Sequence, residues 1–305
     1  MTARNAARSQ GQRAGRLGGI IAAAVVGVAA LVGGLMLAER FNDSDAGDQV
    51  IGAATAEDPG VVHVHALGVN PADGLLYAAS HTGLYRVGED GTSSRIADRY
   101  QDTMAFTVTG PDQFVASGHP DLREGLPSRL GLIRSTDGAE TWQSVSLQGE
   151  ADFHAIAIAG DLMYGADSTS GSVLASVDAG ATWQERGAAA LATLAVDPAD
   201  PDHLAGADYE GALLESTDGA RTWDTLDAPR ITALFWDDGG LIALGADGAV
   251  LRAETPAGPW EAVGRLASPG LALTGEAGRL FAATDTGALV RSTDGGRTWT
   301  PLTTP

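Results

Sequence analysis

Five of the six histidines fall within residues 63–154, at positions that could bring their imidazoles together. His63 and His65 are two residues apart, so on an extended strand both side chains point to the same side. The other three are His81, His119 and His154. An imidazole can bind a transition metal or exchange a proton near neutral pH. The set is therefore a candidate for a metal site or for an acid–base site.

The residues available beside these histidines bear on which metal would bind. The chain contains no cysteine, which excludes thiolate ligands, thiol catalysis and disulfides. Histidine together with Met104 would suit copper. Histidine with a carboxylate such as Asp102, Asp121 or Asp152 would suit zinc or another divalent metal. The alternative is that each imidazole is structural and bonded to a backbone carbonyl.

Three further residues, Asp208, Glu210 and Arg123, are the candidates for catalysis. Glycoside hydrolysis needs two carboxyl groups about 5–9.5 Å apart. Acidic turns near Asp208 and Glu210 could supply them, but no feature of the sequence selects a pair. Such turns could equally hold a cation or a carbohydrate, or be solvated turns in which aspartate is common.

The element that positions all of these residues is a repeat marked by tryptophan. The tryptophans at 142, 183, 223, 260 and 299 are 37 to 41 residues apart. Four of them end a recognisable motif, Ser-x-Asp-x-x-x-Thr-Trp, hereafter the Ser-x-Asp motif: Ser135–Trp142, Ser176–Trp183, Ser216–Trp223 and Ser292–Trp299. A repeat of this length predicts a radial or solenoid architecture.

Each repeat can be divided into four short strands with turn residues between them. Residues 61–303 supply 243 residues, enough for six such units, so we expect an all-β, six-bladed β-propeller over residues 61–305. The last predicted unit ends at Pro305, so the pattern leaves open whether the ring closes through a shared blade or by packing of blade on blade. The Ser-x-Asp hairpins mark one end of the propeller, and the five histidines and Met104 map to the opposite end, whereas His203 maps to the Ser-x-Asp end.

The Ser-x-Asp motif resembles the Asp-box, or BNR repeat, of sialidases, sortilin-type receptors and photosystem II assembly propellers. The whole chain resembles bacterial membrane-anchored Asp-box proteins that are labelled sialidase-like or glycosyl-hydrolase-like. Two copies carry Ala139 and Ala220 where the second glycine of the motif is expected. Physical reasoning favours a structural role, in which the aspartates accept turn amides and the tryptophans are buried. These residues are Asp137, Trp142, Asp178, Trp183, Asp218, Trp223, Asp294 and Trp299.

Sialidase activity, which the resemblance suggests, is unsupported by the residues present. That family grips its substrate with three arginines and has an early Arg-Ile-Pro motif, which is missing here. Arg86, Arg95 and Arg99 fall at outer-strand positions, and Arg123 is the one arginine well placed on the predicted functional face. Recognition of a carboxylate by an arginine trio is therefore not expected.

The N-terminal residues predict a membrane anchor. Residues 1–16 contain four arginines and no acid, and residues 17–38 contain no charge. A helix of 22 residues spans about 33 Å, enough to cross a bilayer, and the preceding positive charge would keep the N-terminus in the cytoplasm. We expect an uncleaved signal anchor followed by a linker at 39–60 and an extracytoplasmic propeller; a cleaved signal peptide is the alternative.

The net charge of −20 argues against a nucleic-acid partner, because phosphate binding requires a basic surface. We therefore expect a membrane-anchored propeller that binds a ligand, a metal ion such as copper or zinc, or a protein or carbohydrate partner at its histidine-rich face. The alternative is an enzyme, either a glycoside hydrolase or a metal-dependent hydrolase or lyase. Three imidazole nitrogens able to meet one point would favour metal binding.

Overall fold

The computed structural model describes residues 60–302. The chain divides into two units, Met1–Ala53 and Ala54–Pro305, and all described residues belong to the second. The predicted basic tail, membrane anchor and most of the linker lie outside the described residues. Residues 60–302 contain no helix long and apolar enough to span a membrane.

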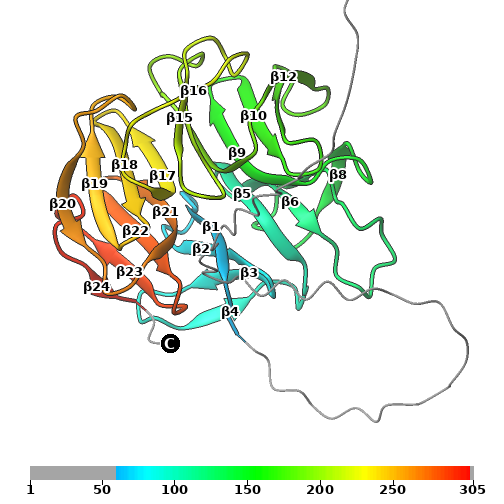
Figure 1. Cartoon of the computed structure of the whole chain (residues 1–305). Helices are drawn as coiled ribbons and strands as arrows, with labels where there is room; N and C mark the ends of the chain where they lie inside the picture. The colour runs from blue at the N-terminus through cyan, green and yellow to red at the C-terminus, as the bar shows by residue number, and fades with distance from the viewer. Residues whose placement is uncertain (1–59, 303–305) are drawn as a thin grey trace, which may run out of the picture. The chain divides into compact units, whose positions relative to one another are not determined.

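The described residues form six antiparallel sheets of four strands each, and every sheet uses four consecutive strands. The sheets are arranged radially around one axis, which makes a six-bladed β-propeller as predicted (Figure 1). The inner strands are β1 (Val64–Val69), β5 (Asp102–Gly110), β9 (Phe153–Ala159), β13 (Leu191–Val196), β17 (Ile231–Asp237) and β21 (Gly270–Glu276). The second strands are β2 (Leu76–Ser80), β6 (Gln113–His119), β10 (Leu162–Asp167), β14 (Leu204–Asp208), β18 (Gly240–Gly245) and β22 (Arg279–Thr284).

The outer half of each blade is shorter and more exposed. The third strands are β3 (Gly83–Val87), β7 (Leu132–Ser135), β11 (Ser172–Ser176), β15 (Leu213–Ser216), β19 (Ala249–Ala253) and β23 (Leu289–Ser292). The outermost strands are β4 (Ser93–Arg95), β8 (Gln143–Ser146), β12 (Gln184–Ala188), β16 (Asp224–Thr225), β20 (Glu261–Arg265) and β24 (Thr300–Pro301). The first inner strand starts at Val64, because His63 has a left-handed backbone (φ 49°) that is incompatible with a strand.

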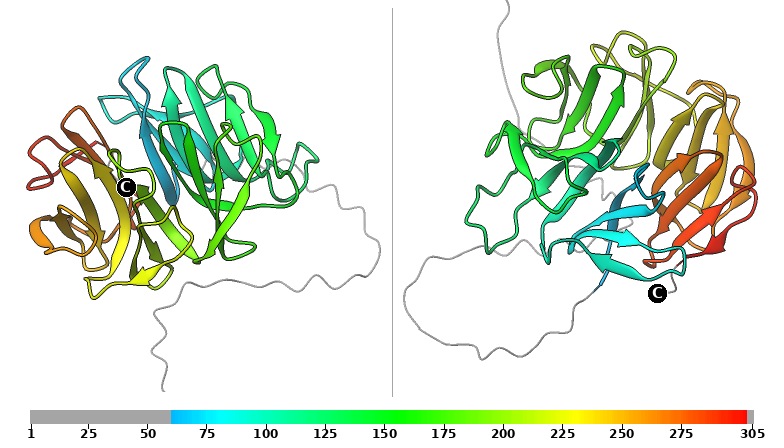
Figure 2. Two further views of the ribbon diagram at one scale, coloured as in Figure 1. Left: turned by 90° about the horizontal axis from the view of Figure 1, so that it is seen from above. Right: turned by 180° about the vertical axis from the view of Figure 1, so that it is seen from behind.

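The hydrophobic core is divided among the six junctions between blades, one buried cluster at each. Small residues such as Ala78, Ala116 and Ala282 are fully buried on the second strands, where blades approach each other closely. The last junction joins blade 6 to blade 1 and contains Phe281 and Leu76. Figures 1 and 2 show these two blades side by side, so the ring closes by packing of blade 6 on blade 1.

The Ser-x-Asp motifs build the hairpins between the third and fourth strands. In the first copy, Ser135 donates to Asp137 Oδ1 at 2.8 Å, and Asp137 accepts the backbone amide and the hydroxyl of Thr141 at 3.0 and 2.6 Å. The other three copies repeat these contacts. The aspartate side chains are therefore occupied by the turn, in agreement with a structural role.

The two central residues of each Ser-x-Asp turn both have a left-handed backbone. This explains why the glycine stands at the first position in some copies of the motif and at the second in others. The residue pairs are Gly138 and Ala139, Ala179 and Gly180, Gly219 and Ala220, and Gly295 and Gly296. Each pair contains at least one glycine, the residue that tolerates this backbone best. The indole of Trp183 donates to Ser146 and that of Trp299 to Gly296, whereas Trp223 Nε1 has no partner among residues 60–302, contrary to expectation.

Candidate metal centre at the axial mouth

The inner strands of the six blades surround a cavity of about 430 Å³ on the propeller axis. Its wall is built mostly from small and aliphatic side chains of these strands. His65 and His154 line it, and they come from blades 1 and 3. The cavity therefore connects residues that are far apart in the sequence.

The inner strand of every blade carries a β-bulge near its start, which leaves one residue without a pairing partner. A bulge changes the direction of a side chain and is common beside functional sites. The unpaired residues, in blade order, are His65, Met104, His154, Ala192, Thr232 and Leu271. Blades 1 to 3 thus place a potential metal ligand at this position, and blades 4 to 6 place none.

Two more positions recur beside the bulge in each blade. The residues two before it are His63, Asp102, Asp152, Ala190, Arg230 and Pro269. The third position is the end of the second strand or the residue just after it. Its residues are His81, His119, Ser168, Tyr209, Ala246 and Asp285, of which His119 is the last residue of β6 and the others follow their strands. We call these three positions in each blade the mouth ring. The histidines of the ring, Met104, the half-buried Asp102 and the buried Asp152 belong to blades 1 to 3.

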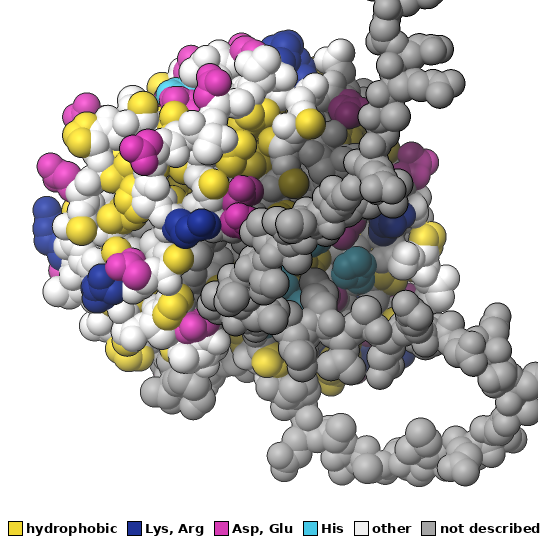
Figure 3. Space-filling view, in the orientation of Figure 1, with side chains coloured by type: hydrophobic (Ala, Val, Ile, Leu, Met, Phe, Trp, Pro, Cys, Tyr) yellow, Lys and Arg dark blue, Asp and Glu magenta, His cyan; other side chains and the backbone are white. Residues whose placement is uncertain are grey.

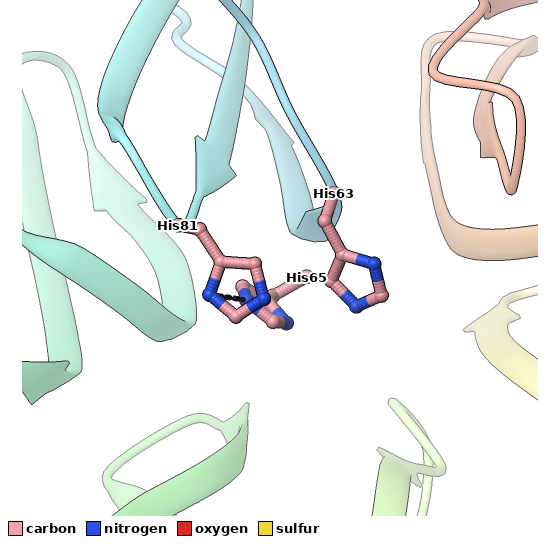
Figure 4. Close-up of side chains that lie close together, drawn as sticks. All are labelled: His63, His65 and His81. Carbon is pink, nitrogen blue, oxygen red and sulfur yellow. Dashed lines mark hydrogen bonds between the residues drawn. The ribbon is translucent and has the colours of Figure 1, made fainter. Parts of the chain in front are cut away.

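The three imidazoles of blade 1 meet in one cluster. One nitrogen from each of His63, His65 and His81 lies within 4.8 Å of the other two. His65 Nε2 and His81 Nδ1 are 3.3 Å apart (Figure 4). His63 reaches the cluster from the chain just before β1, where its left-handed backbone turns the ring toward the other two. Left-handed non-glycine residues are uncommon and concentrate at functional sites.

Asp102 of blade 2 completes this cluster. Its Oδ1 atom lies 2.9 Å from His81 Nδ1 and 3.4 Å from His65 Nε2. Asp102 Oδ1 is buried and accepts no hydrogen bond of good geometry from the described residues. The triangle of Asp102, His65 and His81 donor atoms therefore has edges of 2.9, 3.3 and 3.4 Å. Tetrahedral zinc with bonds of about 2.0–2.1 Å places its ligands about 3.3–3.4 Å apart, so the triangle fits one metal ion.

The electrostatics of the cluster favour a neutral His63 beside an ionised Asp102. Burial lowers the pKa of His63, and the neighbouring His65 and His81 lower it further. Burial opposes ionisation of Asp102, but interactions with His65 and His81 outweigh it and hold the pKa of the carboxyl below its usual range. A neutral imidazole keeps a lone pair for a metal, and a carboxylate supplies negative charge.

A second polar cluster lies at the junction of blades 2 and 3. His154 Nε2 is 3.0 Å from Asp152 Oδ2, and His154 Nδ1 is 2.9 Å from the Tyr209 hydroxyl. His119 Nε2 is 3.9 Å from the same Asp152 oxygen. The Ser168 hydroxyl also donates to this oxygen at 2.9 Å. The five histidines predicted as one set thus divide into a group of three and a group of two.

The other candidate residues are occupied elsewhere. Arg123 pairs with Asp121 and stacks over Tyr100, and the Arg123 hydrogen bond holds the pKa of Asp121 far below its usual range. Asp208 Oδ1 accepts the backbone amides of Glu210 and Ala212. Their roles are those of turn residues.

Two further predicted residues can be placed. His203 bonds to Glu215 at 2.8 Å, away from both clusters, as its predicted position at the Ser-x-Asp end implies. Met104 is half-buried on β5, two residues after Asp102. Acidic side chains are spread over the face drawn in Figure 3, on which histidine side chains are also visible.

Tyr209 and Ser168 are the site residues that sequence reasoning missed. Both stand in the mouth ring at the position of His81 and His119, in the turn after the second strand. An alignment of the repeats by the residue after the second strand, rather than by the tryptophan, would have found them. Their residue types alone carry no such signal.

Comparisons with known proteins bear on the fold. No model of a known protein family matches the sequence, and no curated protein is similar to it. Among solved structures, a chain of a nidogen/laminin complex is similar with a TM-score of 0.55 and 13% identity, over 71% of this chain and 88% of that chain. The GH74 xyloglucanase of Xanthomonas campestris gives 0.52 and 20% over 79% of this chain, which spans only 45% of the enzyme. YCF48 bound to D1 peptide gives 0.50 and 16% over 80% and 82%. At these identities the likeness defines the class of fold, the β-propeller.

Proposed function

We propose that the protein is a metal-binding β-propeller whose metal site is formed by His63, His65 and His81 with Asp102. The observation that carries this proposal is the triangle of Asp102, His65 and His81 donor atoms, with edges of 2.9, 3.3 and 3.4 Å, beside which a His63 nitrogen lies within 4.8 Å of the other two imidazoles. The added carboxylate at 2.9 and 3.4 Å makes the set suitable for zinc or copper.

The surroundings of the site support metal binding over a purely structural role. Structural histidines usually bond to backbone carbonyls, whereas His65 and His81 turn nitrogens toward each other and toward Asp102. The His81 side chain is 48% exposed, which leaves an approach for the ion and for a further ligand. A site of this kind, with an open side facing a cavity, could present the metal to a small molecule or to a partner.

We further propose that the propeller is held outside the cytoplasmic membrane by residues 17–38. The basic residues before this segment and its uncharged composition support the orientation. The resemblance to membrane-anchored Asp-box proteins supports the same location outside the cytoplasmic membrane. A binding or assembly role with a protein partner fits this picture, since a peptide is bound to the similar YCF48 propeller.

Hydrolysis of a glycoside is the alternative function, and the likeness in fold to a xyloglucanase is its support. The candidate carboxylate Asp208 is used by its own turn, which weakens that alternative. A panel of glycoside substrates would test it, and turnover that is lost in Glu210→Gln but kept in His81→Ala would favour the hydrolase.

The metal content of the purified full chain tests the main proposal. We expect the parent chain to retain zinc or copper after gel filtration and the His65→Ala/His81→Ala variant to lose one ion per chain. His203→Ala is the control, because His203 lies outside the cluster and bonds to Glu215. Equal metal content in parent and double variant would refute the proposal.

A further inference from the structure

We propose a second metal site, formed by His119, Asp152 and His154 at the junction of blades 2 and 3. It is separate from the centre in blade 1 and does not depend on it. Both sites border the same axial cavity, because His65 and His154 line it from different blades. The ligand we infer is a divalent ion of borderline character, such as zinc.

The second site repeats part of the first, rotated by one blade. Asp102, two residues before a bulge, faces His81 in the turn of the preceding blade at 2.9 Å. Asp152, also two residues before a bulge, faces His119 at the end of the second strand of the preceding blade at 3.9 Å. A repeated fold places equivalent positions in equivalent geometry. The same pairing of carboxylate and imidazole therefore arises twice.

Each imidazole of the second site has one nitrogen anchored and the other turned toward Asp152. His119 Nδ1 is 2.7 Å from the backbone carbonyl of Ser128, to which it can only donate. A neutral His119 therefore carries its lone pair on Nε2, which faces the carboxylate. Two lone pairs do not attract each other, and 3.9 Å is too long for a hydrogen bond.

A cation between the two groups removes this conflict. Two donors can share an ion when they are less than about 4.2 Å apart, twice the length of a bond of about 2.1 Å. Asp152 Oδ2 lies within this limit of His119 Nε2, at 3.9 Å, and of His154 Nε2, with which it forms a hydrogen bond of 3.0 Å when no ion is bound. Histidine ligands are usually held at their other nitrogen by a carbonyl, carboxylate or hydroxyl group. Ser128 and Tyr209 hold His119 and His154 in this way.

Asp152 itself is placed as a ligand rather than as a surface acid. Its side chain is 9% exposed, and its Oδ1 atom is buried with no hydrogen-bond partner in the described part of the chain. Asp167 fixes its backbone by accepting the Asp152 amide at 2.9 Å. A buried carboxylate oxygen without a partner is costly unless a cation compensates it.

Zinc stoichiometry of the full chain tests the second site. We expect about two zinc ions per chain in the parent protein after loading and gel filtration. The His119→Ala/His154→Ala variant should keep one, the His65→Ala/His81→Ala variant should keep the other, and the combined variant should keep none. Both histidines of the second site are partly exposed, so these changes are compatible with folding, and the thermal midpoint of each variant checks it.

The outcomes separate this inference from the proposed function. Two ions retained in His119→Ala/His154→Ala would overturn the second site. A single ion in the parent, lost in His65→Ala/His81→Ala, would also overturn it while leaving the first centre intact. Loss of zinc in the second-site variant alone would support the second site even if the first failed.

Tyr209 allows a further test in which all three proposed ligands of the second site are kept. It is a positioning residue, so Tyr209→Phe in the His65→Ala/His81→Ala background should weaken zinc binding about 10- to 100-fold without changing stoichiometry at saturation. Isothermal titration measures this affinity. An unchanged affinity would show that the Tyr209 hydroxyl does not position His154 for a metal, and would count against the second site.

Discussion

At the scale of single residues, the proposed metal sites depend on Asp102 and Asp152, the two carboxylates that face the histidines. Asp102 and Asp152 hold the same place in successive blades, and each has a buried oxygen that accepts no hydrogen bond from residues 60–302. The Ser-x-Asp aspartates differ, since amides and hydroxyls of their own turns occupy them. The chemistry of an aspartate in this protein is thus set by its position in the blade.

Asp102→Asn should therefore weaken zinc binding at the first centre. The amide keeps the shape of the carboxylate but removes its charge, and we expect a loss of affinity of at least about tenfold, as for other residues that support a metal. Asp208→Asn is the matched control, because Asp208 belongs to a turn of blade 4 and touches no histidine of either cluster. Titration calorimetry measures the zinc affinity of both variants. Equal affinities for Asp102→Asn and Asp208→Asn would contradict the assignment of Asp102 as a ligand.

At the scale of elements, the bulge at the start of each inner strand positions the ligands. Gly118 on β6 pairs with Thr103 beside this bulge and has a left-handed backbone (φ 140°). A Cβ atom there would lie 2.1 Å from the backbone oxygen of Asp102 and 2.8 Å from the amide of Met104. The glycine thus allows the close approach that the site requires.

Gly118→Ala should consequently both destabilise the fold and weaken metal binding. Alanine at Gly278 is the control, since that residue is also left-handed (φ 79°) but a Cβ there would meet nothing within 4 Å. We expect Gly278→Ala to lower the free energy of unfolding by about 1 kcal/mol with unchanged zinc affinity, and Gly118→Ala to exceed this. Urea denaturation and zinc titration measure the two effects; identical behaviour of the two variants would contradict the role of the bulge.

The Ser-x-Asp hairpins make stability depend on pH in the acid range. Hydrogen bonds from the turn amides and the threonine hydroxyls lower the pKa of Asp178, Asp218 and Asp294 to about 2, from an ordinary value of 3.8. A carboxyl whose pKa is lower in the folded protein stabilises the fold above the unfolded pKa, and this contribution is lost as the pH falls through the folded pKa. The relevant window is therefore from about pH 4 to about pH 2.

The thermal midpoint should fall across this window, and Asp218→Asn should reduce the fall. The variant lacks one titrating carboxylate, so its midpoint should be lower than that of the parent at neutral pH and closer to it at pH 2. Differential scanning calorimetry at a series of pH values gives both curves. Parallel curves would mean that this aspartate does not contribute through its ionisation.

At the scale of the whole molecule, packing joins the first blade to the last. Phe281 of blade 6 is buried against blade 1 residues such as Leu76 and Ala78. Ion pairs also cross this junction, from Glu89 to Arg279 and Arg291, but at 3.9 and 3.7 Å, with Glu89 68% exposed. Exposed ion pairs contribute little, so the apolar contact should dominate closure.

Phe281→Ala should lower the free energy of unfolding by about 3–5 kcal/mol, as is usual for removal of a buried aromatic ring. Glu89→Gln should lower it by less than about 1 kcal/mol. Urea denaturation of both variants measures the difference. A larger effect from Glu89→Gln would show that the ring closes mainly through charge.

The fold could be predicted from the sequence because the tryptophan repeat marks five of the six blades, and the same succession of short strands and turns occurs in blade 1, which has no tryptophan. The end of the propeller that carries the histidines could also be predicted, because the order of the strands fixes which turns lie at each end. The division of the histidines could not be predicted, because it depends on a bulge that inserts His65, Met104 and His154 between paired residues. These inner strands are apolar at most positions, so their hydrophobic pattern does not reveal a one-residue insertion. The part played by Tyr209 was hidden for a related reason, since it contacts His154 from the next blade.

The most direct test of the central claim is the position of bound metal in crystals of the zinc-loaded full chain, located by anomalous scattering at the zinc edge. We predict a peak about 2.0–2.1 Å from nitrogens of His65 and His81 and from Asp102 Oδ1. A second peak should lie between His119, Asp152 and His154. Crystals that carry zinc only on the acidic turns of the surface, or none at all, would contradict the account.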